Sequence, residues 1–344
     1  MKHNLALVGF GVVGQGLVEI LIEKAEDLKK RHGFDYSVVA VSDIQKGSVY
    51  DEKGLEIQKL LSLVAENGNI EGYPRGIKGW DSLKTITESN ADIIVELSFT
   101  NIETGEPAMS HFKAAFETGK HLVTTNKGPV ALAYKELAEM AEEKGVQFRI
   151  EGTVMSGTPV VNLATLCLAG NDIREIRGIL NGTTNYILTE MEKGQSYEAA
   201  LKQAQELGYA EAVPDADVEG WDALAKVLIL SNVVMGGALK VSDVEREGIT
   251  KITLEDIRKA KDAGKRWKLI GQTRKENGSI KAKVSPEMIP TSDPLAGVGG
   301  ATNALTFDTD LLGQVTVVGA GAGKRETGYS VLTDLLDIHR TLKK

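Results

Sequence analysis

A glycine-rich turn near the N-terminus constrains the fold of this chain more than any other feature. The apolar run Leu5–Val8 leads directly into Gly-Phe-Gly-Val-Val-Gly at 9–14, and a helical pattern of apolar residues follows. A second apolar run then ends at Ser42 and Asp43. A buried parallel strand, a glycine turn, a helix and another strand form a βαβ unit. The pattern therefore predicts a dinucleotide-binding domain of the Rossmann type.

The three glycines of this turn have distinct physical tasks. Gly9 allows the tight turn, Gly11 removes the Cβ that would keep the backbone away from a pyrophosphate, and Gly14 lets the helix approach the strand closely. The helix that begins here offers free N–H groups and a partial positive charge to the phosphates. Together these features predict a bound dinucleotide.

The residue that ends the second strand bears on which dinucleotide is bound. Asp43 stands where an acidic side chain accepts hydrogen bonds from the ribose hydroxyls, which favours NAD. Lys46 and Lys53 follow nearby, and either could instead meet a 2′-phosphate. The sequence therefore predicts NAD(P) and leaves the choice between NAD and NADP open.

Strands and helices alternate through the first part of the chain, and the pattern changes after about residue 151. In the first part, strands are expected at 93–97, 121–124 and 147–150, helices at 107–118 and 134–144, and an irregular helix and loop at 51–87. In the second part, strands are expected at 173–179 and 315–318 and helices at 198–207, 223–234, 254–269 and 330–340. The expected fold class is α/β, with a Rossmann domain at 1–152, an α+β domain at 153–318 and a segment at 319–344 that returns to the first domain.

Composition and charge exclude several classes of function. Apolar residues make up 42% and charged residues 26% of the chain, as in ordinary globular proteins. The net charge of −8 comes without a dense basic patch, so neither nucleic acid nor a membrane surface is an expected partner. No apolar run approaches the roughly 18 residues that span a bilayer, so a cytoplasmic location is expected. The single cysteine, Cys167, lies in an apolar run and is expected to be a small buried residue.

Two polar segments directly follow predicted strands. Thr-Asn-Lys-Gly-Pro at 125–129 comes after a parallel strand, and ligands bind outside the carboxyl ends of such strands. Lys127 is therefore expected to face the nicotinamide. The segment Leu180–Leu188 places Asn and Thr side chains between a strand and a helix. These side chains cap the helix, contact the substrate, or do both.

A third polar segment contains a carboxylate and a lysine on one helix face. Asp222 and Lys226 are four residues apart, so they are neighbours on a helix surface. A solvent-exposed pair of this kind stabilises a protein by only a few tenths of a kcal/mol. Here Ala225 and the apolar run 227–230 flank the lysine, which is an improbable setting for a wholly solvated face. A desolvated lysine can act as a proton carrier, and this function is expected for Lys226.

The motifs occur in a fixed order along most of the chain. They are the glycine turn at 9–14, Thr-Asn-Lys-Gly-Pro at 125–129, Asn-Gly-Thr-Thr-Asn-Tyr-Ile-Leu at 181–188, Gly-Tyr-Ala-Glu at 208–211 and then Asp217, Asp222 and Lys226. Pro294-Leu295-Ala296, Asn303-Ala304 and the alternating Gly319–Gly323 agree as well. In this order and spacing the sequence resembles the homoserine dehydrogenases, in the short form without a regulatory domain.

The resemblance implies interconversion of L-homoserine and L-aspartate 4-semialdehyde with NAD(P), a step in threonine and methionine biosynthesis. Lys226 would be the general acid/base at the substrate oxygen, and Lys127 would assist it. The substrate would be held by Thr183, Tyr209, Glu211, Asp217 and Asp222, with Glu211 pairing with its ammonium group. The cofactor would be held by Gly9, Phe10, Gly11, Val12, Val13, Gly14, Asp43, Ser98, Thr100, Thr125, Asn126, Lys127 and Gly321.

Two loops depart from the usual pattern of this family. Gly-Tyr-Ala-Glu is followed by Ala-Val-Pro at 212–214, where the family usually has Pro-Asp-Pro. The junction loop reads Glu-Gly-Thr-Val-Met-Ser-Gly at 151–157, where many members have Val-Gly-Ala-Gly. In similar enzymes this loop holds a monovalent cation, largely through backbone carbonyls. The resemblance therefore implies a sodium or potassium ion at Glu151, Val154, Ser156 and Thr158.

Other functions fit parts of the pattern. An aspartate-semialdehyde dehydrogenase handles a related substrate but needs a cysteine nucleophile beside a histidine, and Cys167 sits in an apolar run. A catalytically silent nucleotide-sensing protein would keep the Rossmann fold without needing Lys226 as a proton carrier. A zinc-dependent alcohol dehydrogenase is disfavoured because one cysteine and five scattered histidines give no ligand set. The resemblance alone implies a homodimer, formed through the sheet of a second domain that is both catalytic and dimerising.

Overall fold

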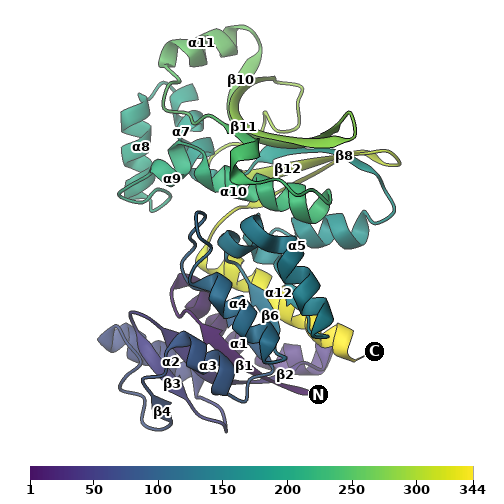
Figure 1. Cartoon of the computed structure of the whole chain (residues 1–344). Coiled ribbons are helices and arrows are strands. Elements are labelled where there is room, and N and C mark those ends of the chain that lie inside the picture. Colours follow the sequence, from purple (N-terminus) through teal and green to yellow (C-terminus); the bar gives the residue numbers. More distant parts are fainter. Residues whose placement is uncertain (344) are drawn as a thin grey trace. The chain divides into compact units, whose positions relative to one another are not determined.

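The computed structural model describes residues 1–343 and divides the chain into two compact units (Figure 1). The first unit comprises Met1–Gly157 together with the C-terminal segment from Gly323 onward, and the second is Thr158–Ala322. The first unit thus runs a few residues beyond the expected boundary at 152, and the C-terminal segment begins at 323 rather than 319. Within residues 1–343, no helix is both long enough and apolar enough to cross a membrane.

The first unit is built on a sheet in the order β4-β3-β2-β1-β5-β6-β7. The parallel strands are β1 Lys2–Val8, β2 Asp35–Asp43, β5 Ile93–Glu96, β6 His121–Thr124 and β7 Phe148–Arg149. The antiparallel strands at one edge are β3 Gly47–Tyr50 and β4 Ile77–Lys78. The central strands are buried on both faces, which is why their sequences are continuous apolar runs rather than alternating ones.

Helices cover this parallel sheet, as the connections between parallel strands require. They are α1 Val12–His32, α2 Ile57–Asn67, α3 Ser82–Glu88, α4 Ala108–Glu117, α5 Lys127–Glu143 and α12 Lys324–Leu342, with a short 3₁₀ turn η1 at Glu151–Thr153. Figure 1 shows α12, in yellow, within the first unit, where it packs against α1. Buried Leu332, Leu335 and Ile338 of α12 join the core of this unit.

The helix after β6 begins earlier than the sequence pattern indicated. We expected it from residue 134, whereas α5 begins at Lys127 and has a local break at Ala133, where φ is −145°. The side chain of Asn126 caps the helix by accepting from the backbone N–H of Gly128 at 3.1 Å. Pro129 lies within the first turn, where a missing N–H costs nothing. The sequence Lys-Gly-Pro therefore starts the helix instead of preventing it.

The second unit is built on a mixed sheet in the order β13-β12-β8-β10-β11-β9. Its strands are β8 Ile173–Ile179, β9 Val244–Arg246, β10 Lys265–Glu276, β11 Ser279–Pro290, β12 Thr302–Thr309 and β13 Gly313–Ala320. All pairs are antiparallel except β9 with β11. Its helices are α6 Val160–Asn162, α7 Gly182–Glu192, α8 Tyr197–Glu206, α9 Asp215–Val218, α10 Trp221–Ile229 and α11 Leu254–Asp262. The π-helical turns are η2 Leu163–Cys167 and η3 Leu230–Val234, and η4 Val241–Asp243 is a 3₁₀ turn.

Two expectations for this unit were wrong. The helix expected over 254–269 ends at Asp262, and β10 begins at Lys265. Gly264, at φ +68°, lies between them and ends the helical pattern. Cys167 is exposed, not buried. It lies in the π-helical turn η2, where its neighbour Leu166 is also 63% exposed.

Candidate active site

The first unit contains a cleft at the carboxyl ends of β1, β2 and β5, where open parallel sheets bind nucleotides. Its volume is about 860 Å³, within the range typical of small-molecule sites. Its walls are the glycine-rich turn, the segment after β2, the segment before α3 and the loop after β5, represented by Gly9, Gly11, Asp43, Lys46, Trp80, Ser98 and Phe99. Several of the predicted cofactor residues therefore line one cavity.

The glycine-rich turn presents the start of α1 to this cleft. Gly11 is the N-cap of α1 and has no side chain to accept from the first-turn N–H groups, which leaves them available to an anionic ligand. Phe10 is fully buried and belongs to the apolar core, so only its backbone is available to a cofactor. Val12 is 65% exposed, Val13 packs against the core, and Gly14 lies against the Gly9 carbonyl.

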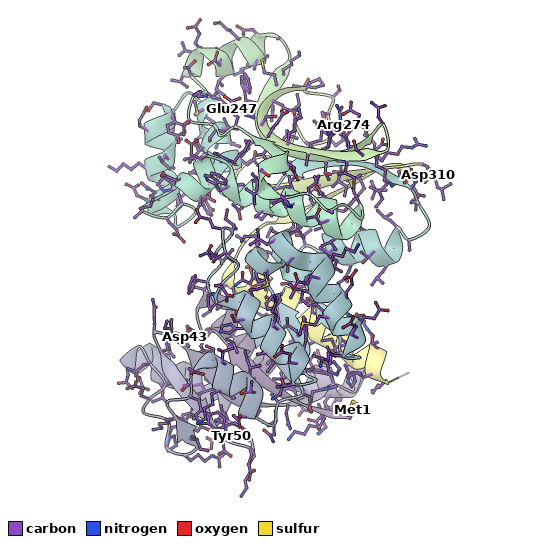
Figure 2. The ribbon with its side chains drawn as sticks, in the orientation of Figure 1. Met1, Asp43, Tyr50, Glu247, Arg274 and Asp310 are labelled. Carbon is purple, nitrogen blue, oxygen red and sulfur yellow. The ribbon has the colours of Figure 1, made fainter. Side chains whose placement is uncertain are left out.

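Asp43 ends β2 beside this turn (Figure 2). Its Oδ2 accepts from the backbone N–H of Phe10 at 2.7 Å, and its Oδ1 accepts from the N–H groups of Gln45 and Lys46, both at 2.9 Å. The carboxylate therefore joins the glycine turn to the loop after β2. Oδ1 thus uses both of its lone-pair sites and Oδ2 uses one of two, so Oδ2 keeps a site for a ribose hydroxyl.

A buried carboxylate that the sequence analysis did not single out organises the loop after β5. Glu96 is fully buried and lies within hydrogen-bonding distance of His111 Nδ1 at 3.1 Å, Thr124 Oγ1 at 3.3 Å and the backbone N–H of Ser98 at 3.2 Å. The hydroxyl of Ser98 also donates to it. The signal in the sequence was a glutamate ending the apolar run Ile-Ile-Val. Four donors account for its burial.

Asn126 ties the segment after β6 to the same loop. Its Nδ2 donates to the carbonyl of Ser98 at 3.1 Å and to that of Phe99 at 3.0 Å. Thr125 and Lys127 flank it and are half-buried, while Thr100 is exposed. The predicted residues Ser98 and Asn126 are therefore joined, and Asn126 acts here by holding the two loops together.

The second unit brings the predicted lysine and its carboxylate together at the start of α10. Lys226 is only 6% exposed, and its Nζ donates to Asp222 Oδ2 at 2.8 Å and to the Leu180 carbonyl at 2.6 Å. Asn181 Nδ2 also donates to Asp222 Oδ2, at 3.0 Å. The pair is therefore buried and held from several sides, which excludes a solvated surface ion pair. Asn181 was not among the predicted site residues, although its motif was.

Asp217 extends this polar cluster. Its Oδ1 accepts from Asn181 Nδ2 at 2.7 Å, and its Oδ2 lies 3.0 Å from Thr183 Oγ1. Burial raises the pKa of Asp217 above its ordinary value, and the nearby charge of Asp222 raises it further. Asp217, Asp222, Thr183 and Lys226 therefore form one connected cluster with Asn181 at its centre.

Tyr209 and Glu211 lie at the more exposed side of the second unit. The Tyr209 backbone carbonyl is 2.7 Å from Thr183 Oγ1, and its ring lies 5.1 Å from that of Tyr186. Its side chain is 47% exposed. Glu211 is exposed, and its backbone carbonyl accepts from Gln205 Nε2 at 3.0 Å. Tyr209 thus contacts the buried cluster through its backbone, while Glu211 presents its carboxylate to solvent.

The junction loop contains a buried acidic pair. Glu151 is 2% exposed, and its backbone N–H donates to Asp334 Oδ2 at 2.9 Å. Among residues 1–343, Asp334 Oδ1 is a buried oxygen with no hydrogen-bond partner. Burial raises the pKa of Asp334 well above its ordinary value, and the charge of Glu151 adds to this effect. Two buried carboxyl groups with an unmatched oxygen are compatible with a bound cation.

The two hydroxyls of the predicted cation set have partners of their own. Ser156 Oγ lies 2.7 Å from Thr327 Oγ1, and Thr158 Oγ1 donates to the Ala320 carbonyl at 3.0 Å. Ser156 adopts a left-handed backbone conformation, with φ of 52°, and Val154 is buried. No cluster of three or more His, Cys, Asp or Glu side chains in the described residues is arranged to hold a metal. A cation here would depend on the loop carbonyls and the Glu151 carboxylate.

The second unit contains another buried lysine, which contacts α7. Lys268 of β10 is 1% exposed, and its Nζ donates to Asn185 Oδ1 at 2.9 Å and to the Val298 carbonyl at 2.7 Å. The pKa of Lys268 falls from its ordinary value of 10.5 to about 8, mainly because the side chain is buried. The negative charge of Glu192 raises this pKa, and the positive charge of Arg266 lowers it. The sequence analysis placed this lysine on a charged helix, so its burial was not foreseen.

Lys268 should make folding stability depend on pH in the alkaline range. Because its pKa is about 8 in the fold and 10.5 ordinarily, the unfolded chain binds more protons between these values, and stability rises with pH there. We expect the free energy of unfolding to gain up to about 3 kcal/mol from this group, and Lys268→Met to lack that gain. Urea unfolding of both proteins near pH 8 and pH 10.5 measures the difference. Equal pH slopes for the two proteins would contradict the expectation.

Two models of known protein families match this chain. The family model for the NAD-binding domain of homoserine dehydrogenase matches residues 9–151, and the homoserine dehydrogenase model matches residues 159–336. The chain belongs to the homoserine dehydrogenase family. Its fold class, its function as an NAD(P)-dependent oxidoreductase of this family and its use of NAD(P) are thereby confirmed.

Relatives of this homoserine dehydrogenase chain match it along its length. The chain is 46% identical to an NAD(+)-dependent homoserine dehydrogenase of Pseudomonas canavaninivorans, covering 99% of this chain and 97% of the relative. It is 45% identical to a homoserine dehydrogenase of Methanocaldococcus jannaschii, covering 99% and 100%. The structure of a hyperthermophilic archaeal homoserine dehydrogenase mutant in complex with NADPH matches with a TM-score of 0.86 at 30% identity, covering 100% of this chain and 99% of that one. The likeness therefore spans both units.

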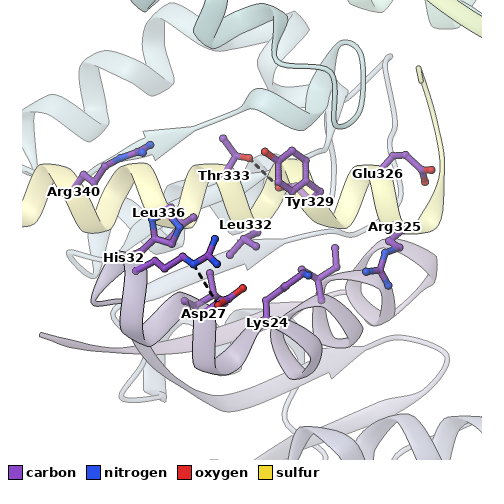
Figure 3. Close-up of a pocket in the computed structure, with 13 residues that line it drawn as sticks. Lys24, Asp27, His32, Arg325, Glu326, Tyr329, Leu332, Thr333, Leu336 and Arg340 are labelled. Carbon is purple, nitrogen blue, oxygen red and sulfur yellow. Dashed lines mark hydrogen bonds and ion pairs between the residues drawn. The ribbon is translucent and has the colours of Figure 1, made fainter. Parts of the chain in front are cut away.

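Another groove of the first unit, between α1 and α12, is not lined by any of the predicted site residues (Figure 3). Its volume is about 620 Å³, and its floor includes Leu28, Leu332 and Leu336. Four basic side chains on its rim each contact a carboxylate: Lys24 and Arg325 contact Glu23, Arg31 contacts Asp27, and Arg340 contacts Asp337. Of the predicted site residues, Gly9, Gly11, Asp43 and Ser98 line the other cleft, and Thr183, Asp217, Asp222 and Lys226 form the cluster of the second unit.

Proposed function

We propose that Lys226 is the general acid/base of the reaction that interconverts L-homoserine and L-aspartate 4-semialdehyde. The observation that carries this proposal is the burial of its Nζ between Asp222 Oδ2 and the Leu180 carbonyl, at 2.8 and 2.6 Å. A neutral amine has two N–H donors and one lone pair. When both donors are taken by these acceptors, the lone pair occupies the remaining tetrahedral direction and can accept the proton of the substrate hydroxyl.

NAD(P), when bound, supplies the acceptor for the hydride that leaves the alcohol carbon. The protein's own groups then have two tasks, which are to move the hydroxyl proton and to hold the zwitterionic substrate. Lys226 carries the proton, and Lys127 assists at the substrate oxygen. Reduction of NAD or NADP by the native chain, dependent on L-homoserine, tests this function. Absence of turnover in folded protein that binds the cofactor would refute it.

The remaining polar side chains of the second unit are proposed to bind the substrate. Glu211 is exposed and available to pair with the substrate ammonium. Thr183 and Asp217 are hydrogen-bonded to each other, and Asp217 has a raised pKa because it is buried. Tyr209 adds a half-exposed aromatic side chain beside them. Glu211→Gln should raise KM for homoserine more than it lowers kcat, and an unchanged KM would refute the pairing.

The cofactor is proposed to bind along the glycine turn, with its ribose at Asp43. Support comes from the cleft that Gly9, Gly11, Asp43 and Ser98 line together. Of the other predicted residues, Thr100, Thr125, Asn126 and Lys127 follow the ends of β5 and β6, and Gly321 lies in the second unit. Because an acidic side chain at the ribose accepts from its hydroxyls and repels a 2′-phosphate, we propose a preference for NAD.

Asp43→Asn should reduce this preference. The amide keeps one acceptor oxygen, gives up the other to an NH2 group that faces a backbone N–H, and removes the negative charge, so repulsion of a 2′-phosphate is lost while Lys46 remains. We expect the ratio of kcat/KM for NAD to that for NADP to fall about tenfold, the equivalent of roughly 1.4 kcal/mol. Steady-state kinetics with each cofactor measure it. An unchanged ratio in a variant of native stability would show that Asp43 does not select the cofactor.

The junction loop is proposed to hold sodium or potassium through Glu151 and through the backbone carbonyls near Val154, Ser156 and Thr158. The buried acidic pair of Glu151 and Asp334, with its unmatched oxygen, is the observation that favours a cation there. Thermal unfolding in sodium, potassium and a bulky organic cation at equal ionic strength tests the proposal. Identical midpoints in all three would contradict it.

A homodimer through the sheet of the second unit is proposed as the working assembly, in the cytoplasm. The strand β13 lies at the edge of this sheet, and Leu311, Leu312 and Val318 on its hairpin are 71%, 62% and 54% exposed. An exposed apolar edge strand is a common pairing surface. Sedimentation analysis showing only monomer at assay concentrations would refute the dimer, and fractionation of cells tests the location.

A further inference from the structure

A buried amide stands behind the carbonyl that contacts Lys226. Asn303, near the start of β12, is fully buried. Its Nδ2 donates to the Leu180 carbonyl at 2.9 Å, and the same carbonyl accepts from Lys226 Nζ at 2.6 Å. A backbone carbonyl has two lone pairs, so it can accept from both donors. Asn303 and Lys226 are therefore joined through a single oxygen atom.

Gly321 leaves part of the space that the Asn303 side chain occupies. A Cβ on Gly321 would lie 2.1 Å from both Cγ and Nδ2 of Asn303, so any larger residue there would displace the amide. A Cβ on Gly182 would be at ordinary contact distance from Asn303, 3.5 Å from Oδ1, and would instead overlap the Ala301 carbonyl at 2.6 Å. The glycine-rich stretch after β13 thus makes room for this amide.

The position of the Asn303 side chain lowers folding stability, because its amide oxygen is left unpaired. Within residues 1–343, Asn303 Oδ1 is buried without a hydrogen-bond partner. Leaving a buried acceptor unpaired costs about 1–3 kcal/mol, and a leucine of similar size would avoid that cost. The useful part of the side chain is therefore its Nδ2 and the bond to the Leu180 carbonyl.

We propose that Asn303 is a positioning residue for Lys226. By fixing the direction of the Leu180 carbonyl, it fixes one of the two acceptors that orient the N–H groups of the lysine, and so directs the lone pair that receives the substrate proton. Asp222 is the other acceptor, and Asn181 holds Asp222 in place. This inference rests on the proposed role of Lys226.

Two carboxylates near Lys226 must be considered when the effects of substitutions at Asn303 are predicted. Asp222 contacts Nζ directly, and Asp217 lies one residue beyond, bonded to Asn181. Asn303→Leu removes the donor without adding charge. Asn303→Asp keeps the shape, but an ionised carboxylate cannot donate to the Leu180 carbonyl, so this variant also loses that bond and in addition places a negative charge near Nζ, which favours the charged lysine. Both variants therefore remove the orienting bond, and only Asn303→Asp adds a change in charge.

The test compares four variants of the full chain for homoserine oxidation across pH. Asn303→Leu should lower kcat about 10-fold to 100-fold, with KM for homoserine and cofactor affinity nearly unchanged. Asn303→Asp should move the pH at which kcat reaches half its maximum to a higher value. Asn232→Leu is the matched control. The side-chain amide of Asn232, in the same unit, makes two partly buried hydrogen bonds to the backbone of Leu239 but none to Leu180. This variant should keep the native kcat and pH profile.

Lys226→Ala completes the set and separates the two proposals. If it retains turnover, Lys226 is not the proton carrier and the role of Asn303 fails with it. If it is inactive while both Asn303 variants match Asn232→Leu in rate and pH profile, only the Asn303 inference is overturned. If Asn303→Leu does not fold, the isosteric Asn303→Asp still tests the pH shift. Unfolding of both Asn303 variants, with Asn232→Leu folded, would make Asn303 a structural residue and overturn the inference as well.

Discussion

Lys226→Ala is expected to lower kcat for homoserine oxidation by about a thousandfold, in line with the loss of a general base. The lysine is 6% exposed and its Nζ is held by Asp222 and the Leu180 carbonyl, and alanine offers no group that can accept the substrate proton. Because the cleft proposed to bind the cofactor is lined by residues of the first unit alone, affinity for NAD(P) should persist. Steady-state kinetics and cofactor titration measure the two effects separately.

Two further lysine variants test whether the loss of activity comes from the loss of a proton acceptor at this position. Lys226→Arg keeps the positive charge but cannot lose its proton in this pH range, so it should be nearly as inactive as the alanine variant. Lys259→Ala removes an exposed lysine that also forms an i,i+4 pair, with Glu255 at 2.6 Å, and should leave activity unchanged. A Lys226→Ala enzyme within threefold of native kcat would contradict the assigned role.

Gly11→Ala is expected to weaken cofactor binding by about one to two orders of magnitude while leaving the fold intact. A Cβ at this position meets no atom within 4 Å in the protein, and Gly11 has an ordinary negative φ of −74°. Its stability should therefore stay within about 0.5 kcal/mol of native. The methyl group would occupy the approach of the pyrophosphate, at a cost of about 1–3 kcal/mol, or about tenfold to hundredfold in Kd.

Gly9→Ala is the matched variant in the same turn, and it should behave differently. Gly9 has φ of +103°, and a Cβ there would lie 2.4 Å from the Leu97 carbonyl. Backbone strain and overlap together should cost about 2–6 kcal/mol of folding stability. Urea unfolding and cofactor titration of both variants distinguish the two glycines. Native cofactor affinity in Gly11→Ala would refute the pyrophosphate position.

The regular part of the fold was predictable because its signals are local. Strands β6 and β8 have the bounds that the sequence patterns predicted, and the glycine turn lies between β1 and α1 as expected. The start of β10 was assigned to a helix because Lys265, Arg266 and Lys268 continue the charged stretch of α11, and β11 was not predicted. The start of α5 was missed because its cap is a side-chain bond of Asn126, which periodicity does not record.

The candidate site could be predicted only as far as its motifs extend. The spacing of Asp222 and Lys226 indicated their contact, since four residues make one helical turn. The convergence of Asn181, Asp217 and Asn303 on that pair depends on tertiary packing of α7, α9, α10 and β12, which no local pattern encodes. Glu96 and His111 were missed for the same reason, because their contact joins β5 to α4.

Reduction of NAD and NADP by the native chain with L-homoserine as substrate tests the central claim most directly. The account predicts turnover at alkaline pH with at least one cofactor, faster with NAD, and none when L-homoserine is replaced by L-aspartate 4-semialdehyde and phosphate. Oxidation of the semialdehyde in phosphate, without turnover of homoserine, would contradict it and would match the chemistry of an aspartate-semialdehyde dehydrogenase.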